Sequence, residues 1–178
     1  MPYPPLPPAA RPSGYGLVEL AIALAVVAIL AAMALPSFQR TLAELRADSL
    51  RLQLHAAVAQ ARTEAITRRH VVVACPSADG LQCSSDWSAG WILRKEGTRG
   101  EVLAHHALRP SPGIRAEASG GRLRVRFRPN GRSGGSNFSI PICIGGQRHS
   151  RVVVNLPGRI RSCRVRGPLA CHSEKEGC

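Results

Sequence analysis

The sequence predicts an α+β protein with a long N-terminal helix packed on a C-terminal antiparallel β-rich domain. Three observations support this prediction. An almost unbroken apolar run covers residues 17–35, and a helical pattern without Gly or Pro continues from Ser37 to about Arg69. From Val71 onward, short β-type runs alternate with Gly, Pro, Asn and Ser. All six cysteines follow the apolar run.

The apolar run is long enough to cross a membrane. From Leu20 to Leu35 no side chain is charged or strongly polar, and the whole run of about 18 to 20 residues can span a hydrocarbon core. Glu19 lies near one end, where a carboxylate is costly in lipid and indicates a partner. An ordinary membrane anchor is the alternative. A secretory signal peptide fits less well, because the helical pattern continues beyond the run.

The second half of the helical pattern is amphipathic, and the following sheet is its natural cover. We expect one helix from about Leu17 to Thr67, kinked at Pro36 where the apolar run ends. The predicted organisation is a leader (residues 1–14), a transmembrane helix (15–36), its amphipathic continuation (37–69), a β domain (70–167) and a tail (168–178).

Seven short runs in the β domain are candidate strands, with turn signals between them. The candidates are Val71–Cys75, Trp91–Lys95, Glu101–Ala107, Arg122–Arg128, Phe138–Ile144, Arg151–Asn155 and Arg159–Val165.

The chain is strongly basic, with a formal net charge of +13, and the charge belongs to the β domain. Residues 68–178 hold 19 of the 24 Lys and Arg residues but only 7 of the 11 acidic residues. A small domain this basic attracts polyanions or anionic surfaces. A surface charged only for solubility is the alternative, although such surfaces usually mix both signs.

The six cysteines favour a domain exported to an oxidising compartment. They allow many connectivities. Among these we favour Cys75–Cys83, which closes a short loop rich in turn formers, Cys143–Cys163, which ties two late strands, and Cys171–Cys178 in the tail. A zinc site is the competing interpretation, but no CxxC pair occurs, and His105, His106 and His172 lack ligand spacing. We therefore expect no metal or cofactor.

Residues 13–36, SGYGLVELAIALAVVAILAAMALP, resemble the class III signal of type IV pilins and pseudopilins. The resemblance implies that prepilin peptidase cuts between Gly14 and Tyr15 and that the new N-terminus at Tyr15 is methylated. It also implies that Glu19 guides assembly with other major and minor pilins by pairing with the N-terminal amine of a neighbouring subunit. Two departures are Tyr15, where pilins usually have Phe, and Gly16, where they often have Thr.

The β domain is similar to that of the GspH/FimT group of minor pilins. The resemblance rests on a cysteine-bearing loop after the first strand, the text DWSAGW at 86–91 and the text FRPNGRSGG at 127–135. We interpret both texts as structural, because paired tryptophans around a turn usually pack on a core.

FimT-like minor pilins are associated with DNA binding through a C-terminal GRxR motif, and this chain has GRIR at 158–161. The resemblance implies non-specific binding of extracellular double-stranded DNA, which supports uptake in natural transformation. It also implies a single-pass inner-membrane protein with a periplasmic domain, which later enters a pilus at the cell surface.

The residues themselves agree with phosphate binding. Arg159 and Arg161 are two apart, so on an extended segment they point to the same side, and guanidinium groups bind phosphate bidentately. Gly158 would let the backbone approach a phosphate and offer its N–H. Ile160 would face the domain, and a Cys143–Cys163 bridge would hold the loop rigid. We expect four further arginines to widen this surface: Arg148, Arg151, Arg164 and Arg166.

Residues 122–128, RLRVRFR, alternate strictly, which places four arginines on one face of a strand and Leu123, Val125 and Phe127 on the other. A half-buried strand with a solvated outer face explains this pattern. The alternative is that the arginines extend the DNA surface or contact an acidic neighbouring pilin.

Enzyme motifs give no support for catalysis, and we expect no catalytic residues. The stretch Gly131–Ser136 resembles the GDSGG text of chymotrypsin-like proteases, but Arg132 replaces the aspartate and a flexible turn explains it better. No Walker A, Rossmann or HExxH text occurs. Two alternatives to DNA uptake remain: a GspH-like pseudopilin of a type II secretion system, and a minor pilin that primes pilus assembly without DNA binding.

Overall fold

A computed structural model describes residues 16–97, 101–118, 122–135, 137–171 and 173. The chain divides into two compact units, Met1–Arg40 and Thr41–Cys178. The first helix, α1 (Leu17–Arg68), confirms the single long helix predicted from the sequence and ends one residue later than expected.

In the first unit, α1 presents apolar side chains to its surroundings. Its most apolar window has a mean hydropathy of 2.7, and none of that window is buried, so the helix is long and apolar enough to cross a membrane. Glu19 lies in the first turn of the helix. Pro36 lies inside the helix, which continues through it although its ring removes one backbone N–H donor.

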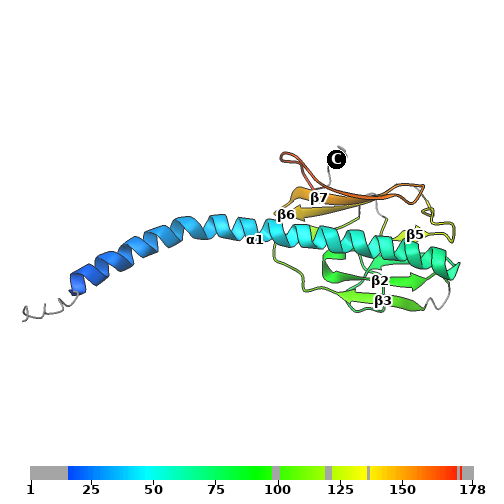
Figure 1. Ribbon diagram of the computed structural model, residues 1–178, viewed down its shortest axis with the longest axis horizontal. Coiled ribbons are helices and arrows are strands. Elements are labelled where there is room, and N and C mark those ends of the chain that lie inside the picture. Colours follow the sequence, from blue (N-terminus) through cyan, green and yellow to red (C-terminus); the bar gives the residue numbers. More distant parts are fainter. Residues whose placement is uncertain (1–15, 98–100, 119–121, 136, 172, 174–178) are drawn as a thin grey trace, which may run out of the picture. The chain divides into compact units, whose positions relative to one another are not determined.

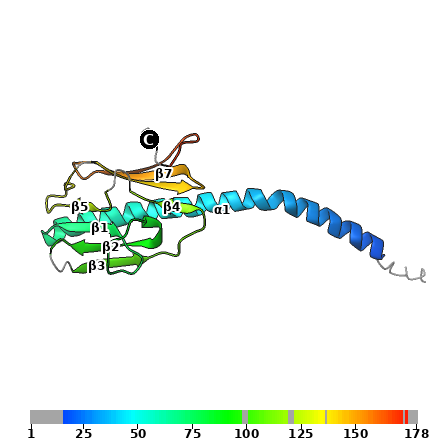
Figure 2. The same ribbon diagram turned by 180° about the vertical axis from the view of Figure 1, so that it is seen from behind.

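In the second unit, the remaining part of α1 buries one face against both sheets. Figure 1 shows β2 and β3 beside the helix on one side and β6 and β7 on the other, and Figure 2 shows the same arrangement from behind. The buried face repeats at helical spacing, as expected for an amphipathic helix. It consists of Ala47, Asp48, Leu50, Leu54, Ala57, Val58, Ala61 and Ala65.

The first sheet is antiparallel and has the strand order β3-β2-β1-β5. Its strands are β1 (Val72–Pro76), β2 (Gly90–Lys95), β3 (Val102–Ala107) and β5 (Val125–Phe127). The first three confirm the predicted strands within a residue or two. The predicted strand Arg122–Arg128 is too long, because only Val125–Phe127 pair, and Leu123 is 43% exposed rather than inward-facing.

The second sheet is antiparallel and has the order β4-β6-β7-β8. Its strands are β4 (Ile114–Ala116), β6 (Phe138–Ile144), β7 (Gln147–Val154) and β8 (Ile160–Arg164). The predicted bounds of β6 are correct and those of β8 are within one residue. Strand β4 was not predicted, and β7 begins four residues earlier than expected because polar residues at its start also pair with β6.

The DWSAGW text is structural, as predicted. A short 3₁₀ helix, η1 (Trp87–Ala89), follows Asp86, whose carboxylate accepts hydrogen bonds from the Ser88 amide and hydroxyl. Trp87 is fully buried and meets Phe138 edge-on with ring centroids 6.2 Å apart. Trp91 stacks on His106 on the first sheet. The two tryptophans of this text therefore connect the two sheets through the core.

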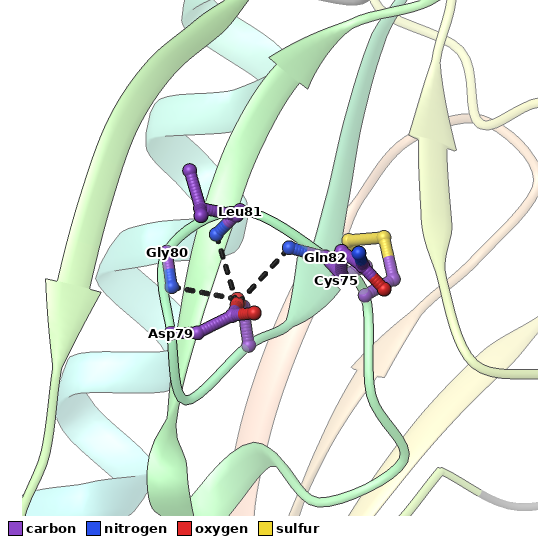
Figure 3. Close-up of a disulfide and its surroundings, with 7 residues drawn as sticks. Cys75, Asp79, Gly80, Leu81 and Gln82 are labelled. Carbon is purple, nitrogen blue, oxygen red and sulfur yellow. Dashed lines mark hydrogen bonds between the residues drawn. A yellow bond between two sulfur atoms is a disulfide. The ribbon is translucent and has the colours of Figure 1, made fainter.

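The loop after β1 is closed by the predicted Cys75–Cys83 disulfide, with Cα atoms 5.5 Å apart. Inside this loop the Asp79 carboxylate accepts hydrogen bonds from the Leu81 and Gln82 amides, at 2.9 and 3.0 Å, as Figure 3 shows. The Ser77 hydroxyl donates a third bond at 2.9 Å. The Gln82 and Leu81 amides and the Ser77 hydroxyl hold the pKa of Asp79 at about 2, because each stabilises the ionised form.

We therefore predict that the loop loses stability in acid. A folded pKa below the ordinary value of 3.8 gives a stabilisation that is present above that value and is lost as the pH falls toward about 2. Urea unfolding at neutral pH and at decreasing pH would compare the wild type with Asp79→Asn under oxidising conditions. The wild type should lose its advantage over the variant across this window, whereas a constant difference at every pH would contradict the assignment.

Candidate nucleic-acid interface

The GRIR motif lies at the turn that joins β7 to β8. The Gly158 amide donates to the Asn155 carbonyl at 2.8 Å, and the Asn155 amide donates to the Arg159 carbonyl at 3.0 Å. Strand β8 pairs only with β7 in the sheet order, so the motif runs onto an edge strand. Arg159 and Arg161 are both exposed, whereas Ile160 is partly buried and packs on the core. Exposure therefore alternates over these three residues, with Arg159 just before β8 and Arg161 on it.

Gly158 has a different role from the one predicted. Its N–H is already bonded within the turn, and the residue is buried, so it does not offer that donor to a phosphate. Its φ of +83° is in the left-handed region that favours glycine. A Cβ at this position would collide with the carbonyl oxygen of Gly131. Gly158 thus permits close contact between two turns.

The partner turn belongs to the FRPNGRSGG text, so this text is also structural. Its Ser133 amide donates to the Leu156 carbonyl at 3.1 Å, and the Ser133 hydroxyl donates to the Asn155 carbonyl at 3.1 Å. The turn also forms an isolated bridge between Phe127 and Ser133. These bonds join the end of β5 in the first sheet to the β7–β8 turn in the second.

Arg62 of α1 lies beside the motif, and the sequence did not predict this contact. Its Nε donates to the Gly131 carbonyl at 3.0 Å, and that nitrogen lies 3.3 Å from where a Gly158 Cβ would be. Arg62 is 96 positions before the motif in the sequence, and its helical spacing alone gives no signal of this contact. It adds a third segment to the positive surface around the turn.

Arg148 and Arg151 do not widen the surface, and the prediction that they do is wrong. They are 7% and 9% exposed. The Arg148 guanidinium donates from Nε and Nη2 to the Cys171 carbonyl, at 3.1 and 2.8 Å, and from Nη2 to the Ser173 carbonyl. Burial, together with the nearby charge of Arg151, lowers the pKa of Arg148. Arg148 therefore fixes the C-terminal tail.

The predicted disulfides of the late strands are also wrong. Cys143 pairs with Cys171 and not with Cys163, and Cys171 is therefore not available to Cys178. Cys163 is itself disulfide-bonded, and Cys178 lies outside the described residues. The physical reason is the tail, which returns along the start of β7: the Arg148 amide donates to the Leu169 carbonyl, and Ala170 bridges Gln147. This path places Cys171 beside Cys143.

Arg164 forms an ion pair with a residue of α1. Its Nε donates to Asp48 Oδ1 at 3.0 Å and its Nη2 to Oδ2, so the pair is bidentate. The hydrogen bond and charge of Asp48 raise the pKa of Arg164. Arg51 joins the same cluster through Asp48 Oδ1 and the Ser162 hydroxyl. Arg164 fastens β8 to the helix, while Arg166 remains exposed beyond the strand.

The arginines of the 122–128 stripe are divided among different roles. Arg126 forms an ion pair with Glu96, which directly follows β2, and Arg122 donates to the Asn137 carbonyl at 3.0 Å. Arg124 and Arg128 are exposed. The stripe is therefore not one continuous charged face. Its Arg128 end belongs to the turn that contacts the β7–β8 turn, and Arg122 bonds to Asn137, whose side chain accepts a hydrogen bond from the Leu156 amide of that same turn.

A comparison with protein families identifies the family of the chain. A family model described as type II transport protein GspH matches residues 52–158, and a prokaryotic N-terminal methylation motif matches residues 10–35. The chain belongs to the GspH family. A search of curated proteins finds no match. Within the described residues of this GspH-family chain, no three His, Cys, Asp or Glu side chains form a group that could hold a metal ion.

Solved structures confirm the predicted fold of the GspH-family chain. Two crystal structures of the type IV minor pilin FimU of Pseudomonas aeruginosa are each 19% identical, with TM-scores of 0.60 and 0.55. They cover 71% and 70% of this chain and 96% and 99% of the FimU chains. The minor pseudopilin EpsH of the Vibrio cholerae type 2 secretion system is 11% identical, with a TM-score of 0.49 over 66% of this chain and 96% of EpsH.

The family, the methylation motif and the fold make the protein a minor pilin or pseudopilin. Its N-terminal apolar helix fits a membrane anchor with a soluble C-terminal domain. Family members of this kind associate with other pilins and are processed by prepilin peptidase. The predicted processing residues Gly14 and Tyr15 lie outside the described residues, and Glu19 is exposed in the first turn of α1.

We predict that Gly158→Ala destabilises the domain by roughly 1 to 3 kcal/mol, because the new Cβ collides with the partner turn and the backbone is strained. Gly146→Ala is the matched control. Gly146 has a similar φ of +82° but open space around its Cα. Denaturant unfolding should show a larger loss for Gly158→Ala than for Gly146→Ala. Equal losses would mean that backbone strain alone matters and that the contact between turns does not.

Proposed function

We propose that this minor pilin binds the backbone of extracellular double-stranded DNA through Arg159 and Arg161 and thereby supports DNA uptake in natural transformation. The observation that carries the proposal is the state of these two side chains. Arg159 is exposed at the end of the turn and Arg161 is exposed on β8. Among the residues that the structure describes, neither has a carboxylate partner. Elsewhere in the domain, Arg115, Arg126 and Arg164 each pair with an acidic side chain.

Physical chemistry supports a phosphate ligand for such a pair. A guanidinium keeps its charge at physiological pH and offers two parallel N–H donors, which match the oxygens of a phosphate. The turn that carries Arg159 is fixed by its own hydrogen bonds and by the neighbouring turn, so little ordering entropy is lost on binding. Contacts of this kind position DNA without reading its sequence. Binding should therefore be non-specific and should weaken with salt.

The remaining steps of the proposal follow the pilin motif. Prepilin peptidase would cut between Gly14 and Tyr15, Tyr15 would be methylated, and Glu19 would guide packing with other pilins. The subunit would move from the inner membrane into a pilus, with its C-terminal domain first in the periplasm and then at the cell surface. Arg166, exposed beyond β8, would extend the DNA surface.

A second candidate is a GspH-like pseudopilin of a type II secretion system, and the match to the GspH family model favours it. In that role, the basic turn would meet a protein partner. A minor pilin that primes pilus assembly without binding DNA is the third candidate.

The test is DNA binding by the full chain, purified in detergent with its disulfides oxidised. Fluorescence anisotropy with a short duplex of arbitrary sequence would be measured at several salt concentrations for the wild type and Arg159→Gln/Arg161→Gln. We expect about a tenfold or larger loss of affinity in the double variant. We also expect the slope of log affinity against log salt to become shallower by about 1 to 2, since each lost phosphate contact removes about 0.9.

Arg109→Gln/Arg115→Gln is the matched control, because it removes the same charge from exposed positions. Arg115 lies on β4, which pairs with β6 beside the 145–146 turn, at the opposite end of the second sheet from the β7–β8 turn. Equal losses of affinity in both double variants would mean that only the overall positive charge of the protein attracts the DNA. A wild type that does not bind would favour the secretion or assembly candidates.

A further inference from the structure

We propose that the turn formed by residues 128–132 is a second phosphate-binding loop, in which Arg128 and Arg132 hold the DNA backbone next to the point where Arg159 and Arg161 hold it. This inference rests on the proposed DNA binding by the GRIR motif. It assigns a ligand to a segment whose fold role is already explained by its contacts. We call residues 128–132 and 155–159 the twin turns.

The twin turns have the same hydrogen-bond pattern. In the first, the Gly131 amide donates to the Arg128 carbonyl at 2.8 Å and the Arg128 amide donates to the Arg132 carbonyl at 2.9 Å. In the second, Gly158 and Asn155 make the corresponding bonds to Asn155 and Arg159 at 2.8 and 3.0 Å. Gly131 and Gly158 have φ values of +74° and +83°. An arginine, Arg132 or Arg159, therefore follows a left-handed glycine in each turn.

The twin turns also touch each other at these glycines. The Gly131 carbonyl oxygen fills the space that a Cβ of Gly158 would need. Each arginine follows its glycine directly, so the Cα atoms of Arg132 and Arg159 lie about 3.8 Å from the glycines that make this contact. Arg62 Nε bonds to the same Gly131 carbonyl, which fixes both turns against α1. Two arginines at equivalent positions, one in a turn after β5 of the first sheet and one in the β7–β8 turn of the second, thus lie in one small area.

The charges of the first twin turn are not used within the protein. Arg128 and Arg132 are exposed, and neither side chain has a hydrogen bond or ion pair among the described residues. The nearby Arg126, by contrast, pairs with Glu96. Arginines gathered around one contact without carboxylates raise the local positive potential, which attracts a polyanion more strongly than isolated charges do.

The position of the twin turns defines a path for the DNA backbone across the domain. The backbone would pass from Arg161 and Arg159 onto Arg132 and Arg128, over the tips of the turns beside the C-terminal half of α1. It would not pass over Arg148, which is buried and bonded to the C-terminal tail, or over Arg151, which is also buried. The hydrogen bonds of both turns fix the backbone that carries Arg128, Arg132 and Arg159, which lowers the ordering cost of binding.

The test compares three double variants of the full chain in detergent, measured by anisotropy with the same duplex. They are Arg128→Gln/Arg132→Gln, Arg159→Gln/Arg161→Gln and the control Arg109→Gln/Arg115→Gln. We expect the first to lose roughly fivefold or more in affinity beyond the control and to make the salt slope shallower by about 1 to 2. Thermal unfolding would show that the variants remain folded.

A second measurement uses only the wild type. Arginine-specific dicarbonyl labelling, read by mass spectrometry with and without the duplex, should show protection of Arg128 and Arg132 but not of Arg109. If the turn variant matches the control while the GRIR variant loses affinity, and Arg128 and Arg132 stay unprotected, the second loop is refuted and the GRIR proposal stands. If the wild type does not bind the duplex at all, both proposals are overturned.

Discussion

The buried face of α1 holds the domain together, because side chains from both sheets enter the single core that contains it. Four of its residues, at positions 47, 57, 61 and 65, are alanines, which allow the sheets to approach the helix closely. Larger side chains at these positions would force the sheets apart. The same helix also binds, through Arg62, the 128–132 turn that contacts the β7–β8 turn, and it fastens β8 through Asp48. The position of the basic surface therefore depends on how this helix is packed.

Much of the fold could be predicted because its elements have strong local periodicity. The helix and strand β6 carry long patterns that extend over their whole length. Strand β4 has only three residues, too few for alternation to be distinguished from a loop. Strand β7 begins with Gln, Arg, His and Ser, which do not read as a strand and pair only because β6 lies beside them. Tertiary pairing decided these two cases.

The candidate site was predictable only in its local part. The exposure of Arg159 and Arg161 follows from the alternation of polar and apolar residues where the chain enters β8. The burial of Arg148 does not, because its acceptors are main-chain carbonyls of a tail more than twenty positions away. The Cys143–Cys171 pairing depends on the same path of the tail. The role of Arg62 depends on a contact across most of the chain. None of these long-range contacts can be recognised from the local sequence.

The contact between Gly131 and Gly158 means that the GRIR motif cannot be transferred to another protein by itself. A loop transplanted into a related pilin would keep its shape only if the recipient also had a glycine carbonyl at the facing turn and room for an arginine beneath it. The two segments should therefore change together during evolution, although 27 positions separate them. A search for relatives with this surface gains discrimination by requiring both glycine–arginine pairs and the helix arginine, since a GRxR text alone is common in arginine-rich chains.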